Sequence, residues 1–465
     1  MKKIFAILPL VAVLALSSCS EEFIEKVKPY TMTEDIVFND PDYIEADLLG
    51  CYSIFKASYP TFMGGLGFVV FDSRGDDIVN VSNPVTMQET YEMRVNSVSQ
   101  ENGYIFNYAY YTINYSNLFA DKLEKYNCKE ILGEELYNQY RAEARFLRAY
   151  SYFILCQLYS KPYCVDPDCP AVPLRLEGLE SSGHTSCPLS TIGEIYAQIL
   201  EDLDPDSLPD APHDAAGVAR ASKAAAHLLK MRVYMAMNDW DNAITEGKAI
   251  SGYELAADVT SLYGENDVYS SKEMIFALPS TSQDKPNTQM SCSEYFDIQA
   301  QVCWIDMEGG ICSQAGYFLP TDQRISSLVV TDGDFYYTAK YVNYGDHQDW
   351  VPLMRFAEVE LNLAECYVNK GQADLAKASL YNVRSRSIDP ADDVIDVTSL
   401  SGDNLKTAVY NEKRLEFLCE GIRGIDIARR GENFVKKNTY VDINVAAKDS
   451  AWPLPDTEQT YNKAL

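Results

Sequence analysis

Basic residues are scarce in this chain. Its 465 residues include 39 lysines and arginines against 68 aspartates and glutamates, which gives a formal net charge of −29 at pH 7. A surface this acidic repels phosphate groups, so the composition argues against nucleic acids and anionic membrane surfaces as partners. Beyond that, the charge indicates only a well-solvated protein.

Histidine and tryptophan are also rare, with four of each, and the common catalytic and metal-binding motifs are missing. The histidines are scattered, and no His-Glu-x-x-His, Cys-x-x-Cys, Gly-x-Ser-x-Gly or phosphate-loop sequence occurs. The sequence therefore gives no ground for a metalloenzyme, a serine hydrolase or a nucleotide-binding protein. No cofactor is expected. The sequence indicates no calcium site and does not decide whether calcium binds.

The one long uncharged apolar run covers residues 4–16 and follows two lysines. This run is too short to span a bilayer comfortably and fits the hydrophobic segment of a secretory signal. Next comes "LSSC", which ends at Cys19 and resembles a bacterial lipobox. We therefore expect a signal peptide over residues 1–18 and lipid chains on Cys19. An ordinary signal with an incidental cysteine is the alternative.

Helical periodicity, in contrast, is abundant. Apolar residues recur at helical spacing over 42–57, 104–126, 134–159 and 192–203. Two segments, near 222–250 and 354–386, each predict a helix, a tight turn and a second helix. Antiparallel helix pairs of about 34 residues are typical of tetratricopeptide repeats. We predict a mainly α fold with a tetratricopeptide-like helical-pair scaffold over residues 40–250 and 350–435.

A region of about 253–349 has a different composition. Glycine, serine, aspartate, asparagine and aromatic residues dominate it, and only short strands such as "EMIFAL" and "FYYTAKYVNY" are predicted. A loop-rich, irregular insertion of this length is usually functional, so we expect it to carry the ligand side. The glycine-rich stretch 61–68 is predicted to be a turn that breaks the first helix.

Charges run through an apolar helix pattern in "NEKRLEFLCEGIRGIDIARRGE", residues 411–432. A carboxylate on an apolar face is costly unless it is paired, and arginine suits bidentate pairing. A positive φ at Gly421 would end the helix and let Arg423 reach Glu416 or Glu420. We predict an ion-pair lock that joins the last helices to the scaffold, made of Glu412, Glu416, Glu420, Arg423, Asp426 and Arg429. A catalytic carboxylate pair is the alternative.

The succession of these segments resembles the SusD/RagB family of outer-membrane nutrient-binding lipoproteins over nearly the whole chain. It carries the lipobox, "EARFLRAYSYFILCQLYSKPY", "RASKAAAHLLKMRVYMAMNDWDNAI", "RFAEVELNLAECYVNKG", "NEKRLEFLCEGIRGIDIARRG" and a terminal "WPLP". Two departures stand out. Gly424 occupies a position where the family usually has an aromatic residue, and the tail after "WPLP" is short.

The resemblance implies a single SusD-like domain over residues 19–465, with helical repeats under a variable, loop-rich face. It implies a lipid-anchored outer-membrane protein that faces the cell exterior and is not an enzyme. Its partner would be a SusC-like TonB-dependent transporter, and its ligand an oligosaccharide or polysaccharide. A peptide or other nutrient, or a purely protein-binding scaffold, remains the alternative.

Sugar binding calls for exposed aromatic rings that stack on the apolar faces of pyranoses, with polar groups around them. Trp240, Trp350 and Trp452 have positions that the scaffold explains, which leaves Trp304. We predict ligand stacking by Trp304 and Tyr295, with Phe296 and Tyr317 nearby. We predict a polar rim from the N-terminal part of the chain, formed by Arg74, Asp77, Tyr91 and Asn96. The alternatives are that the aromatic residues pack within the insertion and that the aspartates only shape a turn.

Overall fold

The computed structural model describes residues 33–57, 61–81, 87–181, 186–210, 214–264, 268–287 and 290–465. The predicted signal peptide and Cys19 lie outside these residues. No helix within the described ranges has the length and apolar character needed to cross a membrane.

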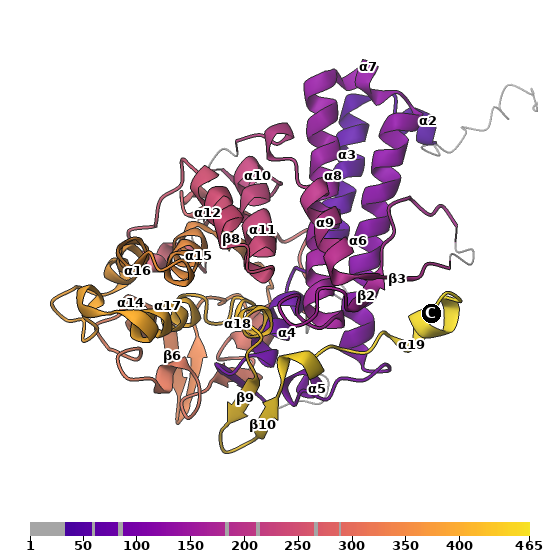
Figure 1. Cartoon of the computed structure of the whole chain (residues 1–465). Coiled ribbons are helices and arrows are strands. Elements are labelled where there is room, and N and C mark those ends of the chain that lie inside the picture. Colours follow the sequence, from indigo (N-terminus) through magenta and orange to yellow (C-terminus); the bar gives the residue numbers. More distant parts are fainter. Residues whose placement is uncertain are drawn as a thin grey trace, which may run out of the picture.

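Long helices that lie side by side form one side of the molecule (Figure 1). They are α3 (Pro41–Lys56), α6 (Gln100–Lys125) and α8 (Glu134–Tyr159), with α9 (Ile192–Asp202) against α8. Asp40 begins α3 by accepting a hydrogen bond from the N–H of Asp42, and Pro41 occupies the first helical position, where a missing N–H costs nothing. The predicted helices lie within a few residues of these bounds.

Shorter helix pairs continue the stack on the other side (Figure 1). They are α11 (Lys223–Ala236) with α12 (Trp240–Ala249), then α15 (Phe356–Asn369) with α16 (Ala373–Ser387), followed by α17 (Gly402–Glu416). Gly247 lets α12 approach closely, since a Cβ there would lie 2.9 Å from the Met231 side chain. The predicted mainly α, tetratricopeptide-like scaffold is confirmed.

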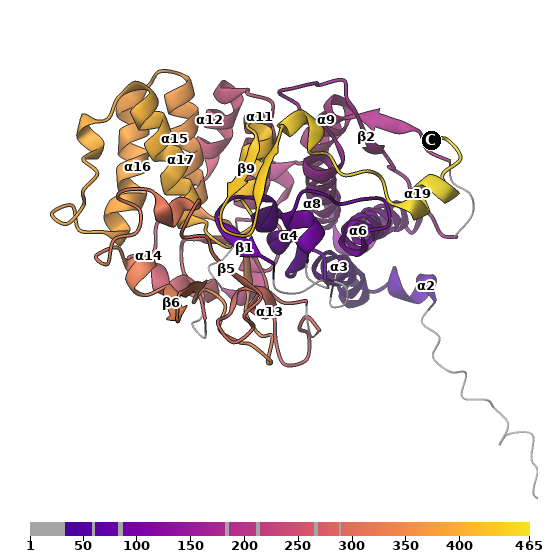
Figure 2. The same cartoon turned by 90° about the horizontal axis from the view of Figure 1, so that it is seen from below.

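Strands occur in the described residues as two-stranded antiparallel pairs. The pairs are β1 (Ile78–Asn80) with β5 (Cys303–Ile305), β2 (Pro170–Pro173) with β3 (Leu189–Thr191), β4 (Met274–Leu278) with β8 (Val351–Arg355), β6 (Val329–Asp332) with β7 (Phe335–Thr338), and β9 (Phe434–Lys437) with β10 (Asp442–Val445). Seen from below, β1, β5, β6 and β9 lie on one face of the molecule (Figure 2). Residues 253–349 supply much of that face through short elements such as α13 (Ser293–Phe296) and α14 (Gln323–Ser326).

A helix replaces part of the turn predicted for residues 61–68. It is α4 (Leu66–Arg74), and all nine of its residues are buried. A helix that is buried on every side has no solvent-exposed polar face, so the usual alternation of apolar and polar residues cannot reveal it. The expectation of a turn is confirmed for residues 62–65 and wrong for residues 66–68, where α4 begins.

Helix α18 (Arg423–Arg429) crosses α4 at very short range. A Cβ on Gly424 would lie 2.4 Å from the carbonyl oxygen of Phe71, which is backbone and cannot move aside easily. This contact leaves no room for a side chain at Gly424. An aromatic side chain there would require α4 to lie elsewhere.

The ion-pair lock is buried, and its acids meet arginines from distant segments. Glu412 lies 2.6 Å from Arg324 and 2.8 Å from Arg384. Glu416 lies 2.8 Å from Arg355 and 2.6 Å from Arg386. These arginines come from α14, α16 and the end of β8, so α17 is tied to three other elements at once.

The second half of the lock fixes α18. Glu420 accepts hydrogen bonds from Arg355 at 2.8 and 3.0 Å. Asp426 pairs with Arg429 at 2.7 Å and Lys413 at 3.1 Å. Arg429 also lies 2.6 Å from Glu365 on α15. All six residues predicted for the lock therefore form ion pairs.

One predicted partner assignment is wrong. Arg423 reaches neither Glu416 nor Glu420, and it pairs with Asp76 through contacts of 2.5 and 2.9 Å. Gly421 does have a positive φ of 70°, as expected, but the turn directs α18 across α4. The residues that follow α4 carry the aspartate that Arg423 meets.

We predict that Gly424→Ala destabilises the protein by about 1–3 kcal/mol, because the added methyl group must displace the α4 backbone. The measurement is the thermal unfolding midpoint. Gly50→Ala in α3 is the matched control, since a Cβ there meets nothing within 4 Å. Alanine is favoured over glycine inside a helix, so the control should unfold at the same or a higher temperature. Equal midpoints for both variants would contradict the close contact.

We also predict that acid weakens the lock through Glu365. Burial raises its pKa, but Arg429 and Arg430 outweigh burial and lower the pKa from 4.5 to about 2. The depressed pKa corresponds to about 3 kcal/mol of stability. That stability is fully present above pH 4.5 and is lost as the pH falls towards 2, because the unfolded chain binds the proton first.

Glu365→Gln should therefore lower the unfolding midpoint at pH 7. The difference from the unmodified protein should shrink between pH 4.5 and 2. Thermal unfolding across this range measures both effects. The exposed Glu124→Gln serves as the control and should change neither the midpoint nor its pH dependence. A constant difference at all pH values would rule out the assigned role of Glu365.

Candidate functional site

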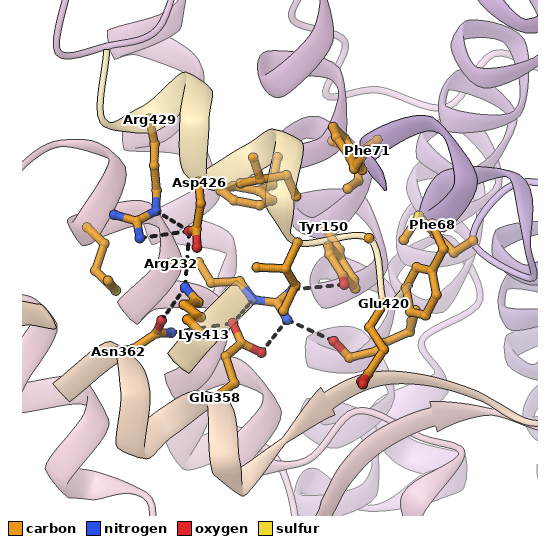
Figure 3. A pocket seen from close by; sticks show the side chains of 18 residues that line it. Phe68, Phe71, Tyr150, Arg232, Glu358, Asn362, Lys413, Glu420, Asp426 and Arg429 are labelled. Atoms are coloured by element: carbon orange, nitrogen blue, oxygen red, sulfur yellow. Dashed lines mark hydrogen bonds and ion pairs between the residues drawn. The ribbon is translucent and has the colours of Figure 1, made fainter. Parts of the chain in front are cut away.

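A small cavity lined by both charged and apolar side chains lies between α8, α15, α17 and α18 (Figure 3). Its volume is about 30 Å³, which is close to the share that one molecule has in liquid water. A sugar ring cannot fit. The cavity is therefore a packing defect among the buried charges and not a nutrient site.

Charges around this cavity are paired, as Figure 3 shows. Arg232 contacts Glu358 at 2.6 and 2.7 Å and donates to the hydroxyl of Tyr150 at 2.9 Å. Burial lowers the pKa of Lys413, which lies 3.1 Å from Asp426. The three carboxylates that line the cavity, Glu358, Glu420 and Asp426, each contact a cation. Such pairing favours a structural role over the alternative of a catalytic carboxylate pair.

Three aromatic side chains meet on the face formed by the short strands. The ring of Trp304 lies 5.0 Å from that of Phe335 and 5.5 Å from that of Tyr440, both edge to face. Phe335 is 39% exposed and Tyr440 46% exposed, while Trp304 is half-buried between them. We call Trp304, Phe335 and Tyr440 the aromatic cluster. Large apolar rings that stay exposed together usually mark a binding site.

Strand geometry places these rings on one side. In β5, Cys303 and Ile305 are buried, so Trp304 between them points away from the core, opposite Val79 of β1. Phe335 begins β7 directly after a turn in which Gly333 has a φ of 59°. Tyr440 lies in the turn between β9 and β10.

The hairpin that carries Tyr440 is held by side chains. Asn438 accepts hydrogen bonds from the N–H groups of Tyr440 and Val441 at 3.0 and 3.1 Å. Its amide donates to Asp306 at 2.6 Å and to the hydroxyl of Tyr91 at 3.0 Å. These bonds connect the turn to the segment that follows Trp304, so the rings keep a fixed arrangement.

Polar groups surround the cluster. Gln301 donates to Asp332 at 2.8 Å, and both residues are exposed. Thr439 donates to Glu308 at 2.6 Å. The indole N–H of Trp304 has no hydrogen-bond partner within the described ranges. Ring faces bordered by amide, hydroxyl and carboxylate groups suit a ligand with apolar C–H faces and many hydroxyl groups.

The other aromatic residues predicted to contact ligand are in the core. Tyr295, Phe296 and Tyr317 are only 3%, 1% and 5% exposed. Phe296 stacks on Tyr341 with ring centres 5.9 Å apart, and Tyr317 donates to the carbonyl of Ala408 at 3.4 Å. The expectation that these rings face a ligand is wrong, because their short elements turn them inward. Phe296 packs within the insertion, against Tyr341, whereas Tyr317 packs against α17, outside it.

The predicted polar rim is also buried, except for one residue. Arg74 is 1%, Asp77 4% and Tyr91 0% exposed. Arg74 lies 5.0 Å from the ring centre of Phe434, the first residue of β9. These three residues therefore support the strands beneath the aromatic cluster and do not form its rim, which corrects the prediction.

Asp77 and Asn96 show two different roles for polar residues near this face. Asp77 accepts hydrogen bonds from Arg414 at 2.6 Å and from the N–H of Ile311 at 2.7 Å. Asn96 is exposed, and its side chain accepts a hydrogen bond from the N–H of Val98 at 3.0 Å. Asn96 shapes the turn that leads into α6, and its contact with a ligand stays a prediction.

Sequence reasoning missed Phe335 and Tyr440. Both lie in or next to a hairpin turn, after "TDGD" and within "KNTYVD". Aspartate, asparagine and glycine in such stretches signal tight turns. An aromatic residue at a turn between two strands is exposed more often than one inside a strand, and this signal could have found them.

The class that the fold and the site define is a tetratricopeptide-like scaffold protein with an aromatic candidate ligand site on a loop-rich face. Two family models match the sequence. Residues 57–235 match a family described as "Starch-binding associating with outer membrane", and residues 320–465 match the "SusD family". The comparison with curated proteins finds no match.

Solved structures agree. A SusD superfamily protein from Bacteroides fragilis is 44% identical, with a TM-score of 0.88 over 92% of this chain and 99% of that one. A putative sugar binding protein from Bacteroides vulgatus has 23% identity and a TM-score of 0.77, over 92% and 97% of the two chains. A SusD-like carbohydrate binding protein from the same species has 19% identity and a TM-score of 0.75 over the same shares. The latter two show the fold alone.

The chain belongs to the SusD family. The resemblance predicted from the sequence is thereby confirmed.

Proposed function

We propose that this protein is a cell-surface lipoprotein that captures a nutrient glycan at the aromatic cluster and passes it to a SusC-like TonB-dependent transporter. The mature chain would begin at lipid-bearing Cys19 and form one SusD-like domain. The observation that carries the proposal is the exposed meeting of Trp304, Phe335 and Tyr440 on a single face.

Keeping the aromatic cluster exposed costs the protein stability. Exposed aromatic rings lose the stabilisation that burial of their apolar surface would give, about 25 cal/mol per Å². A pyranose ring can cover them with its C–H face while its hydroxyl groups reach the surrounding amides and carboxylates. The family description as starch-binding, and the names of two structural neighbours as sugar or carbohydrate binding proteins, support a glycan as this ligand.

Two acids beside the cluster, Asp306 and Glu308, favour binding over catalysis. Asp306 accepts hydrogen bonds from Asn438 and from the N–H groups of Glu308 and Gly309. Glu308 accepts from both the N–H and the hydroxyl of Thr439. Carboxylates engaged in this way hold the hairpins in place, and a hydrolase would need one acid protonated and aimed at the bound sugar.

We predict that Trp304→Ala reduces glycan binding at least tenfold while the unfolding midpoint changes little. The reason is that a half-exposed ring contributes more to ligand stacking than to the core. Affinity gels that contain soluble starch, xylan, galactomannan or other neutral polysaccharides provide the first screen. Isothermal titration with oligosaccharides from the retained polymer then gives the affinity.

Tyr381→Ala is the matched control for this experiment, because Tyr381 is 45% exposed on α16, which contributes no residue to the cluster. It should bind like the unmodified protein. Sugar release by the unmodified protein would indicate a hydrolase instead. Retention by none of the polymers, together with binding of peptides, would replace the glycan by a peptide ligand.

We predict that Cys19→Ala moves the protein from the membrane fraction to the soluble fraction of the producing bacterium. Acyl chains on Cys19 provide the anchor, and each buried methylene contributes about 0.8 kcal/mol to membrane binding. Fractionation and metabolic labelling with a fatty acid measure the change. Ser18→Ala, which keeps a small residue before the cysteine, should remain labelled and in the membrane fraction. Membrane retention of the Cys19 variant would argue against the anchor.

A further inference from the structure

A second aromatic groove lies on the opposite flank of the molecule. It runs along α6 and is closed by the segment after β2 and by α19 (Asp456–Tyr461). In both Figure 1 and Figure 2, α6, β2 and α19 lie together and well away from β6 and β9. The groove therefore shares no element with the aromatic cluster.

The groove has the size and lining of a small-molecule site. Its volume is about 380 Å³, within the range of roughly 300–1,000 Å³ that such sites have. Phe106, Ile113 and Leu179 provide apolar surface, and Tyr110 and Tyr111 provide rings. This volume exceeds that of the small cavity among the buried charges more than tenfold. We call it the tyrosine groove.

The wall opposite α6 is built to stay in place. Asn114 bonds to both the N–H and the carbonyl of Leu179, at 2.8 and 3.2 Å. Asn117 donates to the carbonyl groups of Arg175 and Glu177 at 3.1 and 3.2 Å. Because asparagine side chains of α6 hold this backbone segment along its length, the groove exists before any ligand arrives, which reduces the entropy cost of binding.

Groups on the α6 side are available to a ligand. Tyr111 is 51% exposed and meets Tyr108 edge to face at 5.4 Å. The side chain of Asn107 forms no hydrogen bond to another residue in the part of the chain described here. A free amide beside an exposed ring offers two N–H donors and a carbonyl acceptor next to a stacking surface.

Tyrosine rings continue along the helix beyond the groove, half-buried at Tyr104 and Tyr108 and exposed at Tyr111 and Tyr115. Tyr104, Tyr108, Tyr111 and Tyr115 follow one another at intervals of four, three and four residues, so they share a face of α6. From first to last they extend over about 16 Å of the helix axis. Tyr115 is 50% exposed. A row of rings of this length offers stacking positions to several units of a polymer.

The charges that line the tyrosine groove indicate which class of ligand it can bind. Arg175 lies 3.7 Å from Glu458, so the basic group of the groove is offset by an acid, and Glu180 adds a second acid. With a net charge of −29 on the whole chain, an anionic ligand is disfavoured. Tyrosine rings, the free amide of Asn107 and a weakly acidic lining suit an uncharged, hydroxyl-rich chain.

We propose that the tyrosine groove is a second saccharide site, which holds another stretch of the same neutral polysaccharide that the aromatic cluster binds. The choice of ligand rests on the proposed function. Two sites on different flanks of one protein bind a polymer more tightly than either site alone, because the second contact forms at high effective concentration. Short oligosaccharides gain nothing from this arrangement.

The test uses the full chain and the neutral polysaccharide that the affinity-gel panel retains best. Tyr111→Ala should weaken retention of the polymer about three- to tenfold and leave titration of a short oligosaccharide at the cluster unchanged. Tyr111→Phe, which keeps the ring, should behave like the unmodified protein. Combined with Trp304→Ala, Tyr111→Ala should abolish the retention that remains in the single Trp304 variant.

Tyr381→Ala again serves as the control, and unfolding midpoints exclude loss of structure in each variant. Polymer retention by Tyr111→Ala equal to that of the control would overturn the second site while leaving the proposed function intact. Loss of polymer retention in Tyr111→Ala with full retention in Trp304→Ala would keep the groove and contradict the cluster as the capture site. Retention of no polymer by the unmodified protein would contradict both.

Discussion

Arg355 is the central residue of the buried ion-pair network. Its guanidinium lies 2.5 Å from Glu273, 2.8 Å from Glu416 and 2.8 Å from Glu420, and it is 1% exposed. Breaking a buried pair of this kind by removal of one partner costs about 3–5 kcal/mol, although a fully apolar replacement can be neutral. The network therefore matters most for the arrangement it selects. It admits one position of α17 and α18 relative to β4 and β8, since any other leaves a charge buried without a partner.

This network also holds the candidate ligand site in place. Arg414 and Arg423, on α17 and α18, hold Asp77 and Asp76 just before β1. The carbonyl of Asp77 accepts the N–H of Asp306, and the β1–β5 pairing that follows sets Trp304 opposite Val79. A continuous series of contacts thus leads from the buried charges to the exposed rings. Preorganisation of this kind lets a surface site bind without first ordering its own loops.

The sequence could reveal some of these features and not others for a physical reason. Helix α8 shows a long alternation of apolar and polar residues, and its predicted bounds match those observed. Helix α4 lacks a solvent-exposed polar face, so its periodicity is invisible. Trp304 was found because the other tryptophans had scaffold positions. The sequence could not show whether Tyr295 is exposed or buried, since a helix of four residues has too few positions to indicate which side faces the core. The acids of the lock were predictable from local pattern, whereas Arg324 and Arg355 are far away in sequence and only the fold brings them close.

The same network also constrains what the surface can bind. Many arginines lie in the interior, and all the buried ones except Arg74 are paired there with an acid, so these pairs cancel one another and the net charge of −29 is left mainly for the rest of the molecule. A solvent-facing surface with so few free guanidinium groups has little to offer phosphate, sulfate or uronic acid groups. What it does offer is tyrosine, phenylalanine and tryptophan rings with amides beside them. Because so many arginines lie in the core, the surface favours neutral ligands that are recognised by ring stacking and hydrogen bonds. This holds both at the aromatic cluster and at the tyrosine groove along α6.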